Sequence, residues 1–322
     1  MAGASFLYRL PISSGVPIAA AQAASALRGI DSRRTSKTLR TIRTAVGHRE
    51  EGRAGSGSKW SRRRAKRRKE DILYGRRVLR EALRKDPCRI KEIFLAGGIP
   101  RELLEEIRFL AARRRVSCHE VSRKRLDRLA EGGAHQGVVA VAEPREEKNL
   151  AELLLISGGT SSPPLFLVLE GITDPGNLGA IIRTAECFGC DGIVLSKKGA
   201  PPLDRSTAKR SAGAVEWVPL ARVGNLRTAM RRMKDSGVTL IAADLSPGSR
   251  DLGEGLAVEE PIAVVLGAEE RGISEGTRAL CDHRFSIPME GRVGSLNVSV
   301  AAGIMLWEIF RRRIAAGIRA GG

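Results

Sequence analysis

Two polar side chains, Ser295 and Asn297, stand where an apolar segment begins near the C-terminus. Residues 296 to 310 carry few other polar side chains, which predicts a helix that is buried on most of its faces. A hydroxyl and a carboxamide at the mouth of such a helix can hydrogen-bond to a ligand. The alternative is structural, because Ser295 can also be the N-cap of a helix in the core or at a subunit interface.

A second segment, from Asp174 to Ala185, has the sequence D-P-G-N-L-G-A-I-I-R-T-A and follows an apolar run. This order predicts a junction between a strand and a helix. Asn177 stands at the helix start, where its side chain can cap the helix or reach a ligand. Arg183 lies roughly opposite the apolar stripe of the helix, where an arginine is either solvated or free to meet a ligand. That stripe consists of Leu178, Ile181, Ile182 and Ala185.

A third segment, I-A-V-V-L-G-A-E-E-R-G-I-S from Ile262 to Ser274, is an apolar strand that ends in a glycine and an acid. The acid is Glu269. Carboxylates after buried strands are common, so Glu269 indicates a site only in combination with the other two segments.

A sheet is needed to position these side chains. Apolar runs separated by helices or loops predict strands at Leu165–Glu170, Gly192–Ser196, Val238–Ala243 and Ile262–Leu266. This pattern predicts an α/β domain with a parallel sheet covered on both faces. The pattern alone also allows a dinucleotide-binding enzyme, but no G-x-G-x-x-G follows the first strand.

A smaller α/β unit is expected in front of this sheet, over residues 70–145. The pattern predicts helices at Ile72–Arg84 and Arg101–Arg114 and strands at Lys91–Ala96, Val116–Val121 and Gly137–Ala142. The run S-G-G-T-S-S-P-P marks a linker over residues 146–164. The larger domain then covers residues 165–322.

The charge of the chain is concentrated near its N-terminus. The net charge is +19, and residues 1–70 hold 17 Lys and Arg against 4 Asp and Glu, whereas residues 146–322 hold 21 of each. A basic front half before a neutral domain favours capture of a polyanion by one part and chemistry by another. Residues 1–69 show little apolar periodicity, so we expect a disordered basic extension.

Taken together, the three polar segments resemble the three motifs of the SpoU (TrmH-like) RNA ribose 2′-O-methyltransferases of the SPOUT superfamily. The resemblance covers residues 165–313. I-L-Y-G-R-R-V-L-R-E-A-L from Ile72 and A-H-Q-G-V-V-A from Ala134 resemble the small RNA-binding domain of the large-subunit ribosomal RNA subgroup. One departure is Glu270, where the family has a small residue.

The resemblance implies an α/β knot, a homodimer with active sites completed across the interface, and S-adenosylmethionine held in the knot without a metal. At the matching positions the methyl donor lies against Gly267, Ile287 and Leu296. The resemblance assigns Arg183 to the ribose 2′-hydroxyl, either as its base or, in protonated form, as the stabiliser of the developing alkoxide. The same resemblance assigns the positioning of hydroxyl and substrate to Asn177, Glu269, Ser295 and Asn297.

The expected reaction is methylation of a guanosine in large-subunit ribosomal RNA. Transfer RNA is the alternative substrate, and a ribosome-assembly factor without catalysis is the alternative class of protein. The chain contains no run of 18 apolar residues, so the sequence predicts no membrane span. Its five cysteines follow no regular framework, which favours reduced thiols. We expect a cytoplasmic protein, or an organellar one if residues 1–30, which contain no acid and carry Arg, Ser and Ala, are a transit peptide.

Overall fold

The computed structural model describes residues 70–157, 162–269 and 271–318. The expected basic extension over residues 1–69 lies outside the described residues, and so does Glu270. The described chain forms two sheets, one of four strands and one of seven. Among its helices, none has both the length and the apolar composition that crossing a membrane requires.

The first sheet is small and mixed. Its strands lie in the order β1 (Asp71–Tyr74), β4 (Val138–Ala142), β2 (Ile90–Ala96) and β3 (Ser117–Val121). Helices α2 (Arg76–Lys85) and α3 (Arg101–Ala112) bury apolar side chains against one face, whereas α4 (Arg123–Leu129) covers the other. A short 3-10 turn, η2 (Pro87–Arg89), leads into β2.

The prediction of a helix that begins at Ile72 is wrong at its start. Ile72 and Leu73 belong to β1 and pair with Val141 and Ala140 of β4, so tertiary pairing overrides the helical pattern of this stretch. Gly75 then turns the chain at φ 98°, a backbone conformation that glycine adopts without strain, and α2 begins at the next residue.

The second sheet is parallel throughout. Its strands lie in the order β7 (Leu220–Val223), β6 (Gly192–Ser196), β5 (Leu165–Leu169), β10 (Ile262–Leu266), β8 (Thr239–Ala243), β11 (His283–Ser286) and β9 (Arg250–Asp251). Strands β7, β9 and β11 were not predicted, because β7 and β11 are short and mix polar with apolar residues and β9 consists only of Arg250 and Asp251.

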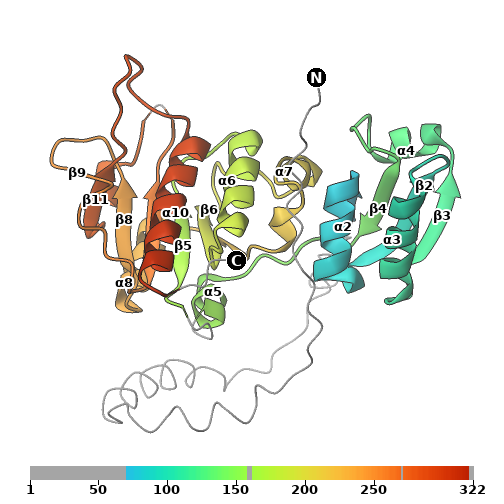
Figure 1. The fold of residues 1–322 in the computed structure, drawn as a ribbon, viewed down its shortest axis with the longest axis horizontal. Coiled ribbons are helices and arrows are strands. Elements are labelled where there is room, and N and C mark those ends of the chain that lie inside the picture. Colours follow the sequence, from blue (N-terminus) through green and yellow to red (C-terminus); the bar gives the residue numbers. More distant parts are fainter. Residues whose placement is uncertain (1–69, 158–161, 270, 319–322) are drawn as a thin grey trace, which may run out of the picture. The chain divides into compact units, whose positions relative to one another are not determined.

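Helices cover both faces of this sheet. The helices beside or between its strands are α5 (Leu150–Ser157), α6 (Pro175–Cys187), α7 (Arg205–Arg210), the turn η3 (Ala214–Glu216), α8 (Leu226–Asp235), α9 (Glu275–Arg278) and α10 (Val298–Ala315). Helices α6 and α10 lie side by side on one face (Figure 1). Leu165 and Leu167 of β5 belong to the core under α6 and α10, whereas Phe166 and Val168 belong to the core with α5 and α8.

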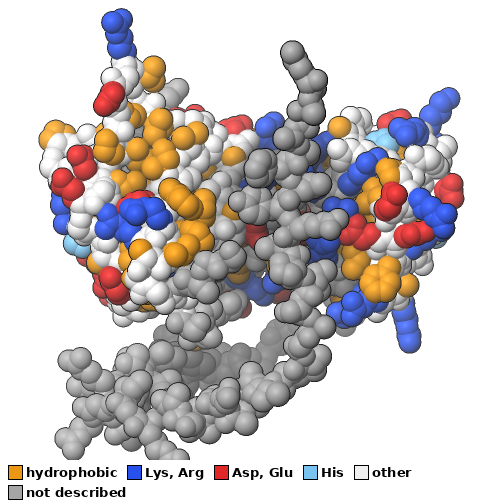
Figure 2. Space-filling view, in the orientation of Figure 1, with side chains coloured by type: hydrophobic (Ala, Val, Ile, Leu, Met, Phe, Trp, Pro, Cys, Tyr) orange, Lys and Arg blue, Asp and Glu red, His pale blue; other side chains and the backbone are white. Residues whose placement is uncertain are grey.

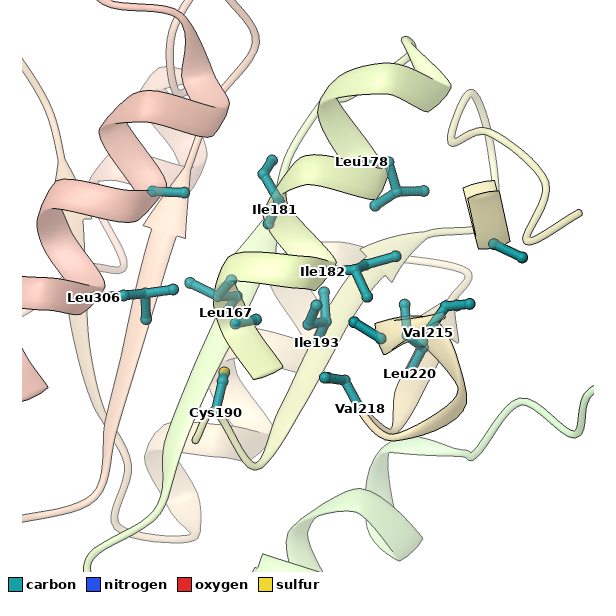
Figure 3. Close-up of a cluster of buried hydrophobic side chains, with 14 of the residues drawn as sticks. Leu167, Leu178, Ile181, Ile182, Cys190, Ile193, Val215, Val218, Leu220 and Leu306 are labelled. Atoms are coloured by element: carbon teal, nitrogen blue, oxygen red, sulfur yellow. The ribbon is translucent and has the colours of Figure 1, made fainter. Parts of the chain in front are cut away.

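The predicted stripe of α6 is buried as expected. Leu178, Ile181 and Ile182 belong to the core beneath that helix, together with Ile193 of β6 and Leu167 of β5 (Figure 3). The prediction of an α/β domain with a parallel sheet covered on both faces is confirmed. The knot remains a prediction.

Candidate active site

The start of α6 is capped by an aspartate, not by Asn177. The Asp174 side chain accepts a hydrogen bond from the backbone N–H of Asn177 at 2.7 Å, and Pro175 occupies the first turn, where a missing N–H costs nothing. Because Asp174 supplies the cap, the side chain of Asn177 is free for another partner. Its Nδ2 donates to Oε1 of Glu269 at 2.9 Å.

The start of α10 is also capped by a side chain, in this case that of an asparagine. The helix begins at Val298, two residues later than predicted, and its N-cap is Asn297 rather than Ser295. Oδ1 of Asn297 accepts from the backbone N–H of Ser299 at 2.9 Å. This leaves Nδ2 of Asn297 to donate to Oδ1 of Asn177 at 3.1 Å and to Oε1 of Glu269.

Asn177, Glu269 and Asn297 therefore form one hydrogen-bonded cluster, which we call the amide–carboxylate cluster. Three segments of the chain meet in it, at the start of α6, after β10 and at the start of α10. Asn177 bonds to both of its partners in the cluster, and Asn297 is also oriented by the bond from the Ser299 N–H, so the cluster is a preorganised group of acceptors and donors at the surface.

The loop after β10 closes tightly on itself at Gly267. A Cβ on Gly267 would lie 2.1 Å from the carbonyl carbon of Gly272 and 2.4 Å from the N of Ile273. Only glycine permits this approach of two backbone segments. The far end of the loop is held by Glu170, whose carboxylate accepts from the backbone N–H of Ser274 at 2.9 Å.

This loop borders a cavity of about 460 Å³. Gly267, Ile287 and Leu296 all line it, so the structure brings the three expected cofactor residues to one place. Ser295 also lines this cavity. The volume lies within the usual range for sites that take a small organic ligand.

Asp244 also lines the cavity, and sequence reasoning missed it. Burial opposes its ionisation, but hydrogen bonds from Ser246 and Arg278 outweigh burial and hold the pKa of Asp244 below its usual value. Nε of Arg278 donates to Oδ2 of Asp244 at 2.8 Å. An acid directly after the apolar strand β8 was the available signal, and it is the same kind of signal that marked Glu269 after β10.

A second cavity, of about 480 Å³, adjoins the first at Glu269 of the amide–carboxylate cluster. Asn177 and Asp174 line this second cavity, and Ala268, Glu269, Arg271 and Val298 line both cavities. Glu269 thus stands on the boundary between two adjoining sites. Two ligands bound in these cavities would meet beside its carboxylate.

Arg183 is exposed, off the apolar stripe of α6 as predicted, but it does not belong to the amide–carboxylate cluster. Six residues of helix place it about 9 Å along α6 and about 120° around it from Asn177. Arg183 instead lines a third cavity with Lys209 and Arg210. Four of the five predicted side chains therefore line cavities, Ser295 the first, Asn177 the second, Glu269 both of these and Arg183 the third. Asn177, Glu269 and Asn297 are in direct contact.

The double role of Asn297 can be separated by one substitution. In Asn297→Asp a carboxylate still accepts from the Ser299 N–H, but it replaces an amide donor by a second negative charge beside Glu269. We expect stability to change by less than about 1 kcal/mol while activity falls by about 100-fold or more. Asn297→Ala should lose both the cap and the activity. Urea denaturation and a tritiated-methyl assay on the same samples measure the two effects, and an active Asn297→Asp protein would limit Asn297 to capping.

Comparison with known proteins identifies the family of this chain. The sequence model described as "SpoU rRNA Methylase family" matches residues 164–307, and the one described as "RNA 2'-O ribose methyltransferase substrate binding" matches residues 72–148. Both matches coincide with the two sheets. The chain belongs to the SpoU family of RNA methyltransferases.

Individual relatives agree with this membership. The chain is 38% identical over 245 residues to the 23S rRNA (guanosine-2'-O-)-methyltransferase RlmB of Vibrio cholerae, covering 76% of this chain and 98% of that protein. An AdoMet-bound rRNA methyltransferase from Sinorhizobium meliloti has a similar structure, with TM-score 0.62, 27% identity and coverage of 76% and 87% of the two chains. The SpoU methyltransferase AviRb from Streptomyces viridochromogenes, also with AdoMet, has TM-score 0.62 and 26% identity over 76% of this chain and 91% of that one.

Proposed function

We propose that this protein transfers a methyl group from S-adenosylmethionine to the ribose 2′-hydroxyl of a guanosine in large-subunit ribosomal RNA. The observation that carries the proposal is the position of Glu269, which joins two amide side chains and borders two adjoining cavities. One cavity suits the methyl donor and the other the acceptor ribose. Family membership and the RlmB relative support the reaction and the substrate.

The residues of the first cavity fit S-adenosylmethionine. Backbone approach at Gly267 shapes the cavity wall, and apolar side chains of Ile287 and Leu296 can pack against the adenine ring. The carboxylate of Asp244 is a suitable acceptor for the hydroxyls of the donor's ribose. Bound there, S-adenosylmethionine supplies an activated methyl group, and the protein must align the acceptor with it.

Arg183 and the amide–carboxylate cluster act on the acceptor, the ribose 2′-hydroxyl. The 2′-oxygen forms a bond to the methyl carbon while the carbon–sulfur bond breaks, and the hydroxyl proton leaves to a phosphate or water. A guanidinium stays protonated in proteins, so Arg183 acts by stabilising negative charge that develops on the oxygen rather than by removing the proton. Asn177 and Glu269 orient the ribose.

The proposed active unit is a homodimer, because α10 presents a second apolar face to solvent. Val300, Trp307 and Ile314 recur every seven residues, so they lie on one side of the helix, and they are 48%, 50% and 36% exposed. Trp307 also packs with Phe188 and Phe310. Figure 2 shows hydrophobic side chains gathered over α10. A continuous apolar face of this kind marks a protein interface, and a two-fold dimer would cover it.

Trp307→Lys should therefore convert the dimer to a monomer. A charge in the centre of an apolar interface is desolvated without a partner, so we expect the dimer dissociation constant to rise by at least about 100-fold. Light scattering at micromolar concentration measures the mass. Phe109→Lys is the matched control, because Phe109 is a 64% exposed aromatic residue of the small domain. A wild-type monomer with full activity would contradict the dimer.

The substrate is tested by mapping ribose methylation in ribosomal and transfer RNA by mass spectrometry, in a strain that lacks the protein. We expect one 2′-O-methylguanosine to disappear from large-subunit ribosomal RNA. Loss from transfer RNA instead would favour the alternative substrate. Complementation with Arg183→Ala tests the assembly-factor alternative, because such a factor would restore ribosome assembly without restoring the methyl group. The protein then acts where ribosomal RNA is present, in the cytoplasm or in an organelle matrix.

A further inference from the structure

The third cavity, which we call the basic pocket, has a volume of about 470 Å³ and a strongly cationic lining. Its charged residues are Arg76, Arg77, Arg80, Arg183, Lys209 and Arg210. Within the described parts of the chain no carboxylate lines it. Arg80 pairs with Glu106 at 2.7 Å, but the other five cations form no salt bridge with any described residue. A pocket with this excess of positive charge is suited to a polyanion.

Arg210 lies between the basic pocket and the amide–carboxylate cluster. Helix α7 packs closely on α6 at two glycines, since a Cβ on Gly179 would lie 2.5 Å from Cβ of Arg210. A Cβ on Gly176 would lie 2.9 Å from Nη1 of Arg210, so the guanidinium rests against the first turn of α6, next to Asn177. Gly176, Gly179 and Arg183 share one face of the helix. Arg210 and Arg183 therefore follow the same side of α6.

Lys209 is anchored from the small domain. Its Nζ donates to the carbonyl oxygen of Ala134 at 2.6 Å and lies 5.1 Å from the centre of the Tyr74 ring. An ammonium group has three donors, so this arrangement orients Lys209 and leaves further N–H groups for an anion.

The A-H-Q-G loop presents a second polar pair in the same pocket. Gln136 has φ 55°, and its side-chain Oε1 accepts from the backbone N–H of Arg76 at 3.2 Å. Nε of Arg76 donates to the carbonyl oxygen of Gln136 at 3.2 Å, which leaves both terminal nitrogens of the guanidinium available. The amide nitrogen of Gln136 is available in the same way, since its oxygen makes the contact.

His135 holds this loop from beneath. Its Nδ1 accepts from the backbone N–H of Gly137 at 3.0 Å, so Nε2 carries the proton and donates to Asp127 at 3.0 Å. The imidazole is buried, and these two bonds fix the loop conformation that places Gln136 in the pocket. The presentation of Gln136 and Arg76 is thus built into the fold of the small domain.

We infer that the basic pocket binds the phosphodiester backbone of the RNA strand that carries the acceptor ribose, with Arg76, Lys209 and Arg210 as phosphate ligands and Gln136 as a polar contact. The inference rests on the proposed function, and in it the basic pocket sets the register of the RNA strand relative to the active site. Phosphates held along one side of α6 would place the adjoining ribose between Arg183 and Asn177. Phosphate contacts of this kind set position rather than sequence preference.

The test compares full-length Lys209→Gln/Arg210→Gln with the wild type, using 23S ribosomal RNA purified from a strain without the protein. Each lost phosphate contact should lower the slope of log affinity against log salt by about 0.7, and the double variant should raise the KM for RNA by about tenfold or more. The kcat should change much less, because a contact made equally in ground and transition states acts on KM. Lys209→Arg/Arg210→Lys keeps the charges and should restore most of the affinity.

Arg231→Gln/Arg232→Gln on α8 removes the same charge from an exposed helix away from the pocket and serves as the control. A double pocket variant with wild-type KM and salt slope, or a loss equal to that of the control, would overturn the inference. Affinity for S-adenosylmethionine, measured by isothermal titration, should be unchanged in every variant. Failure of the wild type to methylate RNA would contradict the proposed function instead, and the RNA-binding comparison would still decide the role of the pocket.

Discussion

Arg183→Ala should lower the rate of methyl transfer by about 10²–10³-fold or more, which is the usual cost of removing one group that stabilises charge in a transition state. Binding of S-adenosylmethionine should stay near the wild-type value, because Arg183 does not line the cavity that holds Gly267, Ile287 and Leu296. Stability should also be little affected, since the side chain is exposed. A tritiated-methyl assay and isothermal titration measure the two quantities.

Two companion variants define what Arg183 contributes. Arg183→Lys keeps the charge but loses the planar fork, so partial activity would indicate charge stabilisation and none would indicate a geometric requirement. Arg231→Ala is the same truncation on the exposed side of α8 and should leave the rate of methyl transfer unchanged. Near-normal turnover of Arg183→Ala would remove this residue from the mechanism.

Gly267→Ala should damage the donor cavity and the fold together. The new methyl group would lie 2.1 Å from the carbonyl carbon and 2.2 Å from the carbonyl oxygen of Gly272, and backbone cannot move aside as a flexible side chain can. We expect a loss of about 3 kcal/mol in stability, at the upper end of overpacking costs. Displacement of the loop should weaken S-adenosylmethionine binding by about 100-fold.

Thermal denaturation and isothermal titration test this expectation. Gly224→Ala is the matched control, because a Cβ there meets open space and its backbone is not left-handed, so only the common effect of alanine on the unfolded chain remains. If Gly267→Ala kept wild-type stability and donor affinity, the tight closure of the loop would have no part in forming the cavity.

The central strands of the larger domain were predictable from sequence, whereas the outer ones were not. A strand buried on both faces is apolar at every position, as β5 and β10 are, and such runs are visible without any partner. Strands β7 and β11 contain Arg222, His283 and Arg284, so their local pattern does not distinguish them from loops. Pairing with a neighbouring strand decided their conformation, as it did for Ile72 and Leu73 of β1.

The sequence by itself predicted five side chains of the candidate site, because Asn177, Arg183, Glu269, Ser295 and Asn297 occur in three motifs whose types and spacing identify the family, but it missed Asp244. It could not determine how these side chains share hydrogen bonds. Whether Asn177 caps α6 or reaches a partner depends on Asp174 taking the cap, and whether Asn297 can meet Glu269 depends on where α10 begins. The tertiary structure also decided that Arg183 lines the basic pocket, since its direction follows from the rotation of α6 and the packing of α7 against that helix. Motif spacing is a property of one chain segment, but contacts among residues 177, 269 and 297 require three segments to meet, and only burial of the core brings them together.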